Sequence, residues 1–232
     1  MGETARVRGQ QLAQESLARG DATGWFETLY GSAHGDAHAV QWADMEVNPN
    51  LVVWLEHAGL RGEGKRALVI GCGLGDDAEE LARVGFAVVA FDISPTAIAW
   101  CHERFPDSPV RYVAADLFTS PPAWHGTFDF VLEVYTLQVL PPDLRPPAIA
   151  RIAGYVAPGG RLLVICRGRD GGDDPGRMPW PLTRAEVDLF RTYGLCETRF
   201  EDYIDHAGSP QRRFRVEYGK VTTADRSSLT DK

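Results

Sequence analysis

The chain lacks any apolar run near the roughly 20 residues that a membrane-spanning helix needs. Its first residues, up to Ser16, lack the apolar stretch of a secretory signal. Arg6 stands where the N-myristoylation pattern requires Ser or Thr. We therefore expect a cytoplasmic protein with no membrane partner.

Cysteine and positive charge are also scarce. The four cysteines form no Cys-x-x-Cys pair, which predicts neither a zinc site nor a disulfide scaffold, and we expect buried thiols. With 24 Lys and Arg against 32 Asp and Glu, the formal net charge is -8, which repels a nucleic-acid backbone. The composition therefore favours a small-molecule substrate, with no metal and no nucleic acid. It predicts nothing about oligomeric state.

What is present is the composition of one globular domain: 232 residues, 44% hydrophobic and 24% charged. We predict a single domain over residues 1–220. Within it, residues 1–60 form a helical cap or lid and residues 61–220 form the sheet core. The polar, aperiodic segment 221–232 is predicted to be a disordered tail.

Short β-branched runs alternate with helical patterns along the core. The runs typical of buried parallel strands are 66–73, 86–92, 110–116, 127–134 and 160–167. Helical patterns lie at 5–18, 22–30, 49–60, 75–84, 94–104, 143–157 and 183–193. Two further strands, 196–204 and 211–218, flank a turn signal. This pattern predicts an α/β fold: a doubly wound, mostly parallel, seven-stranded Rossmann-like sheet with a C-terminal antiparallel hairpin and an N-terminal helical cap.

Two helix starts are specific enough to test. The pair Pro146-Pro147 predicts that the helix within 143–157 begins at Pro147, where a missing N–H costs nothing. Thr183 followed three residues later by Glu186 predicts a capping box. Pro158-Gly159-Gly160 is expected to be the turn before the fifth strand.

A glycine-rich turn follows the first predicted strand, in the order Gly71-Cys72-Gly73-Leu74-Gly75-Asp76-Asp77. Glycines allow a sharp bend and a close approach of a ligand at a strand end. Asp92 ends the next strand 21 positions after Gly71, about the separation at which an acid reaches a nucleoside ribose. The turn therefore predicts a nucleoside-containing cofactor.

The residues after the glycines choose between two such cofactors. A dinucleotide places its pyrophosphate on the helix N-terminus and needs a third glycine at position 76, where Asp76 and Asp77 would repel it. S-adenosylmethionine carries a sulfonium and an ammonium and no phosphate, so acids are tolerated there. The alternative for both acids is a structural role at the helix N-terminus, worth about 0.3 to 1 kcal/mol each.

Later strand ends supply the remaining candidates. Asp116 ends the third strand, where it can accept from an adenine amino group while Leu117 covers the ring, or instead cap a turn. The fourth strand delivers Glu133 and Tyr135 to the same carboxyl edge.

The run from Ala67 to Arg167 resembles the class I methyltransferases, and closely the thiopurine S-methyltransferase group. The segments that carry the resemblance are Ile70-Gly71-Cys72-Gly73, Asp92-Ile93-Ser94, Leu137–Arg145, Pro158-Gly159-Gly160 and Pro179–Thr183. Trp42-Ala43-Asp44 with Asn48-Pro49-Asn50 is similar to the tryptophan-containing lid of that group. Glu133-Val134 departs from the family's usual Asp-Arg, which puts the substrate in question and leaves the cofactor assignment standing.

The resemblance and the motifs together define the expected site. The predicted cofactor is S-adenosylmethionine, and the predicted cofactor-binding residues are Trp42, Gly71, Cys72, Gly73, Asp76, Asp77, Asp92, Ile93, Asp116, Leu117 and Glu133. The predicted catalytic residues are Glu133 and Tyr135.

The acceptor is less constrained. No histidine stands at a predicted strand end, which favours a readily ionised nucleophile such as a thiol. O- or N-methylation of a small aromatic compound or natural product is the alternative, with Glu133, Tyr135, His34 or His38 as base. A non-catalytic S-adenosylmethionine-binding module is a third possibility, and Asp76 argues against a dinucleotide-dependent reductase.

Overall fold

The computed structural model describes residues 3–206 and 209–222. The predicted tail lies outside these residues apart from positions 221 and 222. The chain divides into two compact units: unit 1 comprises Met1–Gly64 and Val69–Leu117, and unit 2 comprises Lys65–Leu68 and Phe118–Lys232. The single-domain prediction stays a prediction, and each unit is described separately.

Unit 1 holds three strands in the order β3-β2-β1, namely β1 (Arg66–Ile70, whose first residues belong to unit 2), β2 (Ala87–Asp92) and β3 (Arg111–Ala114). β2 and β3 are parallel, from Val89 opposite Arg111 to Asp92 opposite Ala114. The Cys72 amide donates to the Phe91 carbonyl at 2.9 Å, which brings the ends of β1 and β2 together. Residues that follow these strands therefore share one edge.

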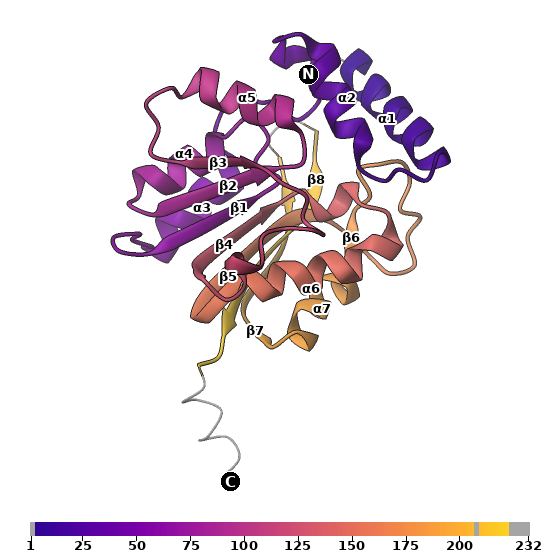
Figure 1. The fold of residues 1–232 in the computed structure, drawn as a ribbon. Coiled ribbons are helices and arrows are strands. Elements are labelled where there is room, and N and C mark those ends of the chain that lie inside the picture. The colour runs from indigo at the N-terminus through magenta and orange to yellow at the C-terminus, as the bar shows by residue number, and fades with distance from the viewer. Residues whose placement is uncertain (1–2, 207–208, 223–232) are drawn as a thin grey trace. The chain divides into compact units, whose positions relative to one another are not determined.

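The first three helices of unit 1 match the predicted N-terminal helices, and the other two follow the glycine turn and β2. In chain order the helices are α1 (Glu3–Ala18), α2 (Gly24–Ala33), α3 (Pro49–Ala58), α4 (Asp76–Arg83) and α5 (Pro95–Arg104), with a short 3-10 turn at Ala37–Ala39. α1 packs beside α2, and α2 also contacts α5 (Figure 1). α5 begins after Ser94, whose side chain accepts from the Ala97 amide at 3.1 Å. Ser94 thus fixes the helix start directly after the end of β2.

Unit 2 holds the strand order β1-β4-β5-β8-β7, with β6 beside β5. Its strands are β4 (Phe128–Val134), β5 (Val156–Arg169), β6 (Leu182–Thr183), β7 (Leu195–Asp205) and β8 (Gln211–Lys220). β4 and β5 are parallel, whereas β8 runs antiparallel to β5 and to β7. The predicted closing hairpin is confirmed, and the described residues contain one more strand, β6, than the seven predicted.

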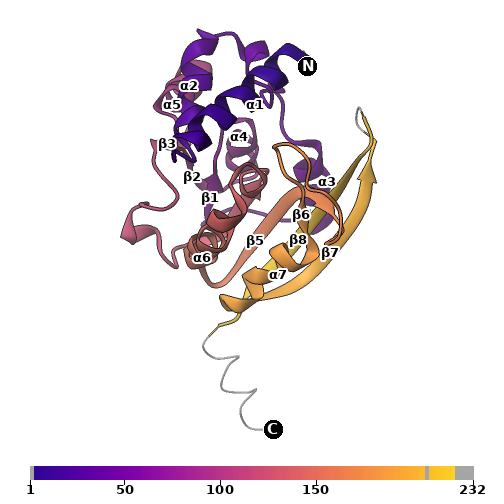
Figure 2. The ribbon, with the colours of Figure 1, turned by 90° about the vertical axis from the view of Figure 1, so that its right-hand side faces the viewer.

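Two helices of unit 2 test the predicted starts. α7 (Arg184–Thr192) begins with the complete Thr183–Glu186 capping box and lies against the hairpin, where the Tyr218 hydroxyl donates to the Val187 carbonyl at 2.7 Å (Figure 2). α6 (Arg145–Tyr155) begins two residues before the predicted Pro147. That prediction is wrong because first-turn amides lack intrahelical acceptors, so a proline pair fits the second and third positions equally well.

β5 also differs from its prediction, because it starts at Val156 rather than Gly160. Phe128 lies opposite Val156 and Phe130 lies opposite Arg161, so the expected Pro158-Gly159-Gly160 turn is a bulge inside the strand. A Cβ on Gly160 would lie 2.9 Å from the Phe128 carbonyl oxygen, so glycine is required there. Periodicity alone could not distinguish this bulge from a turn.

The four cysteines are all free, as expected, but they are not all buried. Cys101 and Cys166 are buried, Cys72 is half-buried, and Cys196 is exposed on β7. The prediction fails for Cys196 because β7 is the last strand in the order and its side chains alternate between the packed face and solvent.

Candidate functional site

The turn between β1 and α4 is built on glycines in the left-handed region. Gly71, Gly73 and Gly75 have φ of 58°, 53° and 94°. A Cβ on Gly75 would lie 2.6 Å from the Tyr112 hydroxyl, and one on Gly73 would lie 3.3 Å from the Tyr30 hydroxyl. Both the conformation and the close neighbours therefore exclude larger residues, as a cradle for a ligand requires.

Asp92 holds this turn from the end of β2. Its Oδ2 accepts from the Gly73 amide and its Oδ1 from the Ser94 amide, each at 3.0 Å. Burial raises the pKa of Asp92 to about 6. Backbone hydrogen bonds from Ser94, Gly73 and Ile93 lower the pKa, but burial has the larger effect. A carboxylate has about four acceptor positions, so Asp92 retains capacity for the hydroxyls of a ribose.

The two acids at the start of α4 already have partners in the protein. Asp76 forms a bidentate ion pair with Arg104, at 2.7 and 2.8 Å. Asp77 accepts from the Asn48 amide at 2.8 Å, and burial raises its pKa to about 6. Asp76 is thus neutralised by α5 and Asp77 anchors the segment before α3, so both have structural roles. Contact of either with a cofactor stays a prediction.

Trp42 belongs to an aromatic cluster. Its Nε1 donates to the Tyr30 hydroxyl at 2.7 Å, and its ring meets those of Trp25 and Phe26 edge-on, with centroids 5.7 and 6.0 Å away. Trp42 is half-buried, whereas Tyr30 is 1% exposed. The side chain is therefore anchored on α2 and keeps one accessible portion, which suits a lid residue.

The loop after β3 is tied to the end of β2. The Ala115 amide donates to the Asp92 carbonyl at 2.9 Å, which places Asp116 one residue beyond this bond. Asp116 is half-buried and Leu117 is buried, at 6% exposure. Unit 1 thus brings the predicted residues at the ends of β1, β2 and β3 to one edge.

Glu133 lies in unit 2 and has no exposed surface. Its Oε1 accepts from the amides of Thr136 and Leu137, at 2.7 and 2.9 Å. Its Oε2 is buried and has no hydrogen-bond partner among the described residues. Burial raises the pKa of Glu133 to about 7, against the two backbone hydrogen bonds that lower it. An orphaned buried acceptor of this kind fits a donor supplied by a ligand.

Tyr135 follows β4 in a strained conformation, with φ of 63°. The guanidinium carbon of Arg213 lies 4.9 Å from the centre of its ring. A non-glycine residue in this region costs on the order of 1 to 3 kcal/mol and is typical of functional sites. Tyr135 is half-buried, and its role toward a substrate stays a prediction.

Sequence reasoning missed two residues on α2. Tyr30 contacts the glycine turn, and Glu27 accepts from Ser94 and Thr96 at the start of α5. Three aromatic residues, Trp25, Phe26 and Tyr30, lie close together in one short predicted helix, and this pattern could have indicated Tyr30. Nothing in the local pattern points to Glu27, because its partners lie 67 and 69 residues away.

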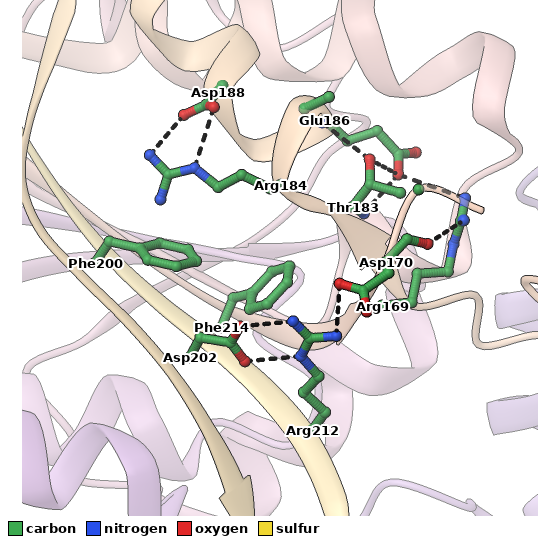
Figure 3. A pocket seen from close by; sticks show the side chains of 12 residues that line it. Arg169, Asp170, Thr183, Arg184, Glu186, Asp188, Phe200, Asp202, Arg212 and Phe214 are labelled. Carbon is green, nitrogen blue, oxygen red and sulfur yellow. Dashed lines mark hydrogen bonds and ion pairs between the residues drawn. The ribbon is translucent and has the colours of Figure 1, made fainter. Parts of the chain in front are cut away.

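A cavity of about 740 Å³ lies in unit 2 between α7 and the β7–β8 hairpin (Figure 3). Phe200 and Phe214 lie along it, and Arg212 pairs with Asp202 at 2.7 Å and with Asp170 at 2.9 Å. None of the predicted site residues lines it. Within residues 3–206 and 209–222, no cluster of three metal-ligating side chains occurs, and no helix is long and apolar enough to cross a membrane.

Comparison with known proteins agrees with this geometry. A family model described as "Methyltransferase domain" matches residues 67–160. The probable thiol methyltransferase 2 of Arabidopsis thaliana is 27% identical over 70% of this chain and 69% of its own length. Thiocyanate methyltransferase 1 of the same plant is 32% identical over 43% of this chain and 45% of its own length.

A bacterial relative and a solved structure extend the likeness. The thiopurine S-methyltransferase of Vibrio parahaemolyticus is 29% identical over 52% of this chain and 61% of its own length. The 1,6-didemethyltoxoflavin-N1-methyltransferase of Burkholderia thailandensis, solved with bound 1,6-didemethyltoxoflavin and S-adenosylhomocysteine, shares the fold. It has a TM-score of 0.65 at 20% identity, over 95% of this chain and 92% of that one. Residues 67–160 therefore match a methyltransferase domain, which supports an S-adenosylmethionine-dependent methyltransferase, and the chain is similar to the thiol and thiopurine S-methyltransferase group.

Proposed function

We propose that this enzyme transfers the methyl group of S-adenosylmethionine to the sulfur of a small-molecule thiol. The observation that carries the proposal is that the enzyme holds no histidine in a buried site: all six are exposed. They are His34, His38, His57, His102, His125 and His206. Of the two other candidate bases, Glu133 has no exposed surface and Tyr135 is half-buried. An acceptor that ionises without an enzyme base suits such a site.

Thiols meet this requirement. A thiol has a reference pKa of about 8.5, so a fraction is already thiolate at neutral pH, whereas an alcohol needs a base. The names of two relatives, a probable thiol methyltransferase and a thiopurine S-methyltransferase, support the same acceptor class.

The residues of unit 1 fit the cofactor by their chemistry. Bound S-adenosylmethionine supplies an activated methyl group on a sulfonium. Asp92 would accept hydrogen bonds from the ribose hydroxyls, since its carboxylate has positions beyond the Gly73 and Ser94 amides. Leu117 would cover the adenine ring while Asp116 accepts from its amino group, and Trp42 would cover the methionine portion and exclude water.

The residues of unit 2 would serve the acceptor. The unpartnered Oε2 of Glu133 would accept from a donor group of the ligand, and a cationic donor would favour the ionised carboxylate. Tyr135 would face the acceptor, and its ring is held by Arg213, which lies 4.9 Å from the ring centre and pairs with Asp205 at 3.3 Å. Catalysis then rests on alignment and desolvation of the nucleophile.

A turnover screen tests the proposal. Thiols, phenols and amines of similar size would be compared by the rate of S-adenosylhomocysteine release. We expect kcat/KM for the best thiol to exceed that of the matched phenol and amine by at least about a hundredfold, because the enzyme supplies no base for them. Preferred turnover of a phenol or amine would establish the O- or N-methyltransferase alternative. Tight cofactor binding without turnover of any acceptor would indicate a binding module.

A further inference from the structure

Glu27 of α2 reaches the start of α5 although its own side chain is exposed. Its Oε2 accepts from the Ser94 hydroxyl at 2.5 Å and from the Thr96 amide at 3.2 Å, and its Oε1 accepts from the Thr96 hydroxyl at 2.6 Å. Partial burial acts to raise the pKa of Glu27, but the hydrogen bonds from Ser94 and Thr96 outweigh it and the pKa is lowered. Glu27 therefore binds the N-terminal end of α5 as a carboxylate.

The partner of Glu27 is directly connected to the predicted ribose acid. Ser94 is fully buried, and its amide donates to Asp92 Oδ1 at 3.0 Å. The other oxygen of Asp92 accepts from the Gly73 amide at 3.0 Å. A continuous chain of hydrogen bonds thus runs from Glu27 through Ser94 and Asp92 to the glycine turn.

α2 makes a second contact with the same turn. Tyr30 lies three residues after Glu27, so both side chains project from one side of the helix. The Tyr30 hydroxyl lies 3.3 Å from the position of a Cβ on Gly73 and accepts from Trp42 Nε1 at 2.7 Å. α2 is therefore fixed at α5 by Glu27 and at the cradle by Tyr30, and it carries the anchor of Trp42.

We propose that Glu27 is a positioning residue for cofactor binding: it latches α2 to α5 and so holds Tyr30 and Trp42 over the glycine turn. The proposal rests on the assignment of Asp92 and the glycine turn to the cofactor. Since Glu27 is exposed, its removal costs the fold little. The removal of Glu27 instead lowers the affinity for the cofactor, because binding must then also order the released helix.

Binding of S-adenosylhomocysteine to the full chain, measured by calorimetry, tests the latch. We expect Glu27→Ala to raise Kd about tenfold, a loss within the range for hydrogen bonds to a charged group, with Tm within about 3 °C of the parent. In turnover, KM for S-adenosylmethionine should rise while kcat at saturation stays within about twofold. Glu56→Ala, which removes an exposed acid of α3, should leave Kd unchanged.

A double-mutant cycle separates the latch from a general effect of charge. Thr96→Val removes one hydroxyl partner of Glu27 and leaves the Ser94 cap intact, so Glu27→Ala should cost at least about threefold less in the Thr96→Val background. Additive effects overturn the latch. Asp92→Asn serves as a positive control: if it weakens binding while Glu27→Ala does not, the latch is wrong and the cradle stands. If neither variant weakens binding, the cradle assignment fails and the latch fails with it.

Discussion

At the scale of single residues, two carboxyl groups show how burial and hydrogen bonding set different roles. Asp92 is 7% exposed and binds two backbone amides with different oxygens, which leaves each oxygen with further acceptor capacity. Glu133 is fully buried and receives both amides on one oxygen, which leaves the other without a partner among the described residues. Asp92 therefore organises the turn, whereas Glu133 keeps one buried oxygen without a partner among the described residues.

Replacing Asp92 with Asn should weaken cofactor binding without unfolding the protein. Loss of charge-assisted hydrogen bonds to ribose costs about 1.5 to 3 kcal/mol, which corresponds to a Kd about 10- to 100-fold higher. Calorimetric titration with S-adenosylhomocysteine measures this, and circular dichroism checks the fold. Asp107→Asn, an exposed acid in the same unit, is the matched control. Unchanged affinity in a folded Asp92 variant would remove Asp92 from the site.

Glu133 should make stability fall as pH rises. Burial raises its pKa from 4.5 to about 7, so the native state binds a proton that the unfolded chain has lost over that interval. The free energy of unfolding therefore falls by at most about 3 kcal/mol as the pH rises from about 4.5 to 7. Above pH 7 this contribution no longer changes. Urea unfolding at pH 5 and pH 8 should show a smaller decrease for Glu133→Gln than for the parent. Equal decreases in the two proteins would contradict a buried, protonated Glu133.

At the scale of elements, helix α2 of the cap lies against the glycine turn of unit 1 through Tyr30. Most of this arrangement was predictable, because the strand runs, the Ser94–Pro95 helix start and the Thr183 capping box are local patterns. The β5 bulge, the pairing of β6 and the Glu27 contacts were not, since each depends on residues distant in sequence. Asp76 shows the same limit: its acidity suggested a cofactor role, but its bidentate partner Arg104 lies 28 residues away.

Trp42→Ala tests the cap. Trp42 is half-buried and hydrogen-bonded to Tyr30, so we expect cofactor affinity and turnover to fall about tenfold, consistent with a cation–π contact of about 0.5 to 2 kcal/mol. The Tm should fall only by a few degrees, since a core residue would cost about 3 to 5 kcal/mol. Thermal melting and calorimetry measure both. A variant that melts far below the parent yet binds S-adenosylhomocysteine normally would show that Trp42 only packs the cap.

The glycine turn should discriminate between cofactors. The first turn of α4 presents Asp77 and Glu79 beside the Asp76–Arg104 pair, and it lacks the glycine at position 76 that a pyrophosphate site needs. We therefore expect micromolar binding of S-adenosylmethionine and no measurable binding of NAD under the same conditions. Competition between S-adenosylmethionine and NAD in one titration series compares their affinities. Tight binding of NAD would refute the assignment of this turn.

At the scale of the whole molecule, the predicted site residues belong to both units. Unit 1 contains the glycine turn, Asp92 and Trp42, and unit 2 contains Glu133 and Tyr135. The class of enzyme was predictable because its motifs are local and their combination is specific. The acceptor was not, because contacts such as that of Arg213 with Tyr135 join residues far apart in the chain.

The central claim is that methyl transfer uses an acceptor thiol that ionises without an enzyme base. The pH dependence of kcat/KM for two thiols whose pKa values differ by about two units tests it most directly. If the thiol ionises without an enzyme base, each profile rises through the pKa of its own thiol. The two midpoints are then separated by about the same two units. Profiles that share one midpoint whichever thiol is used would reveal a titrating group on the enzyme and would contradict the account.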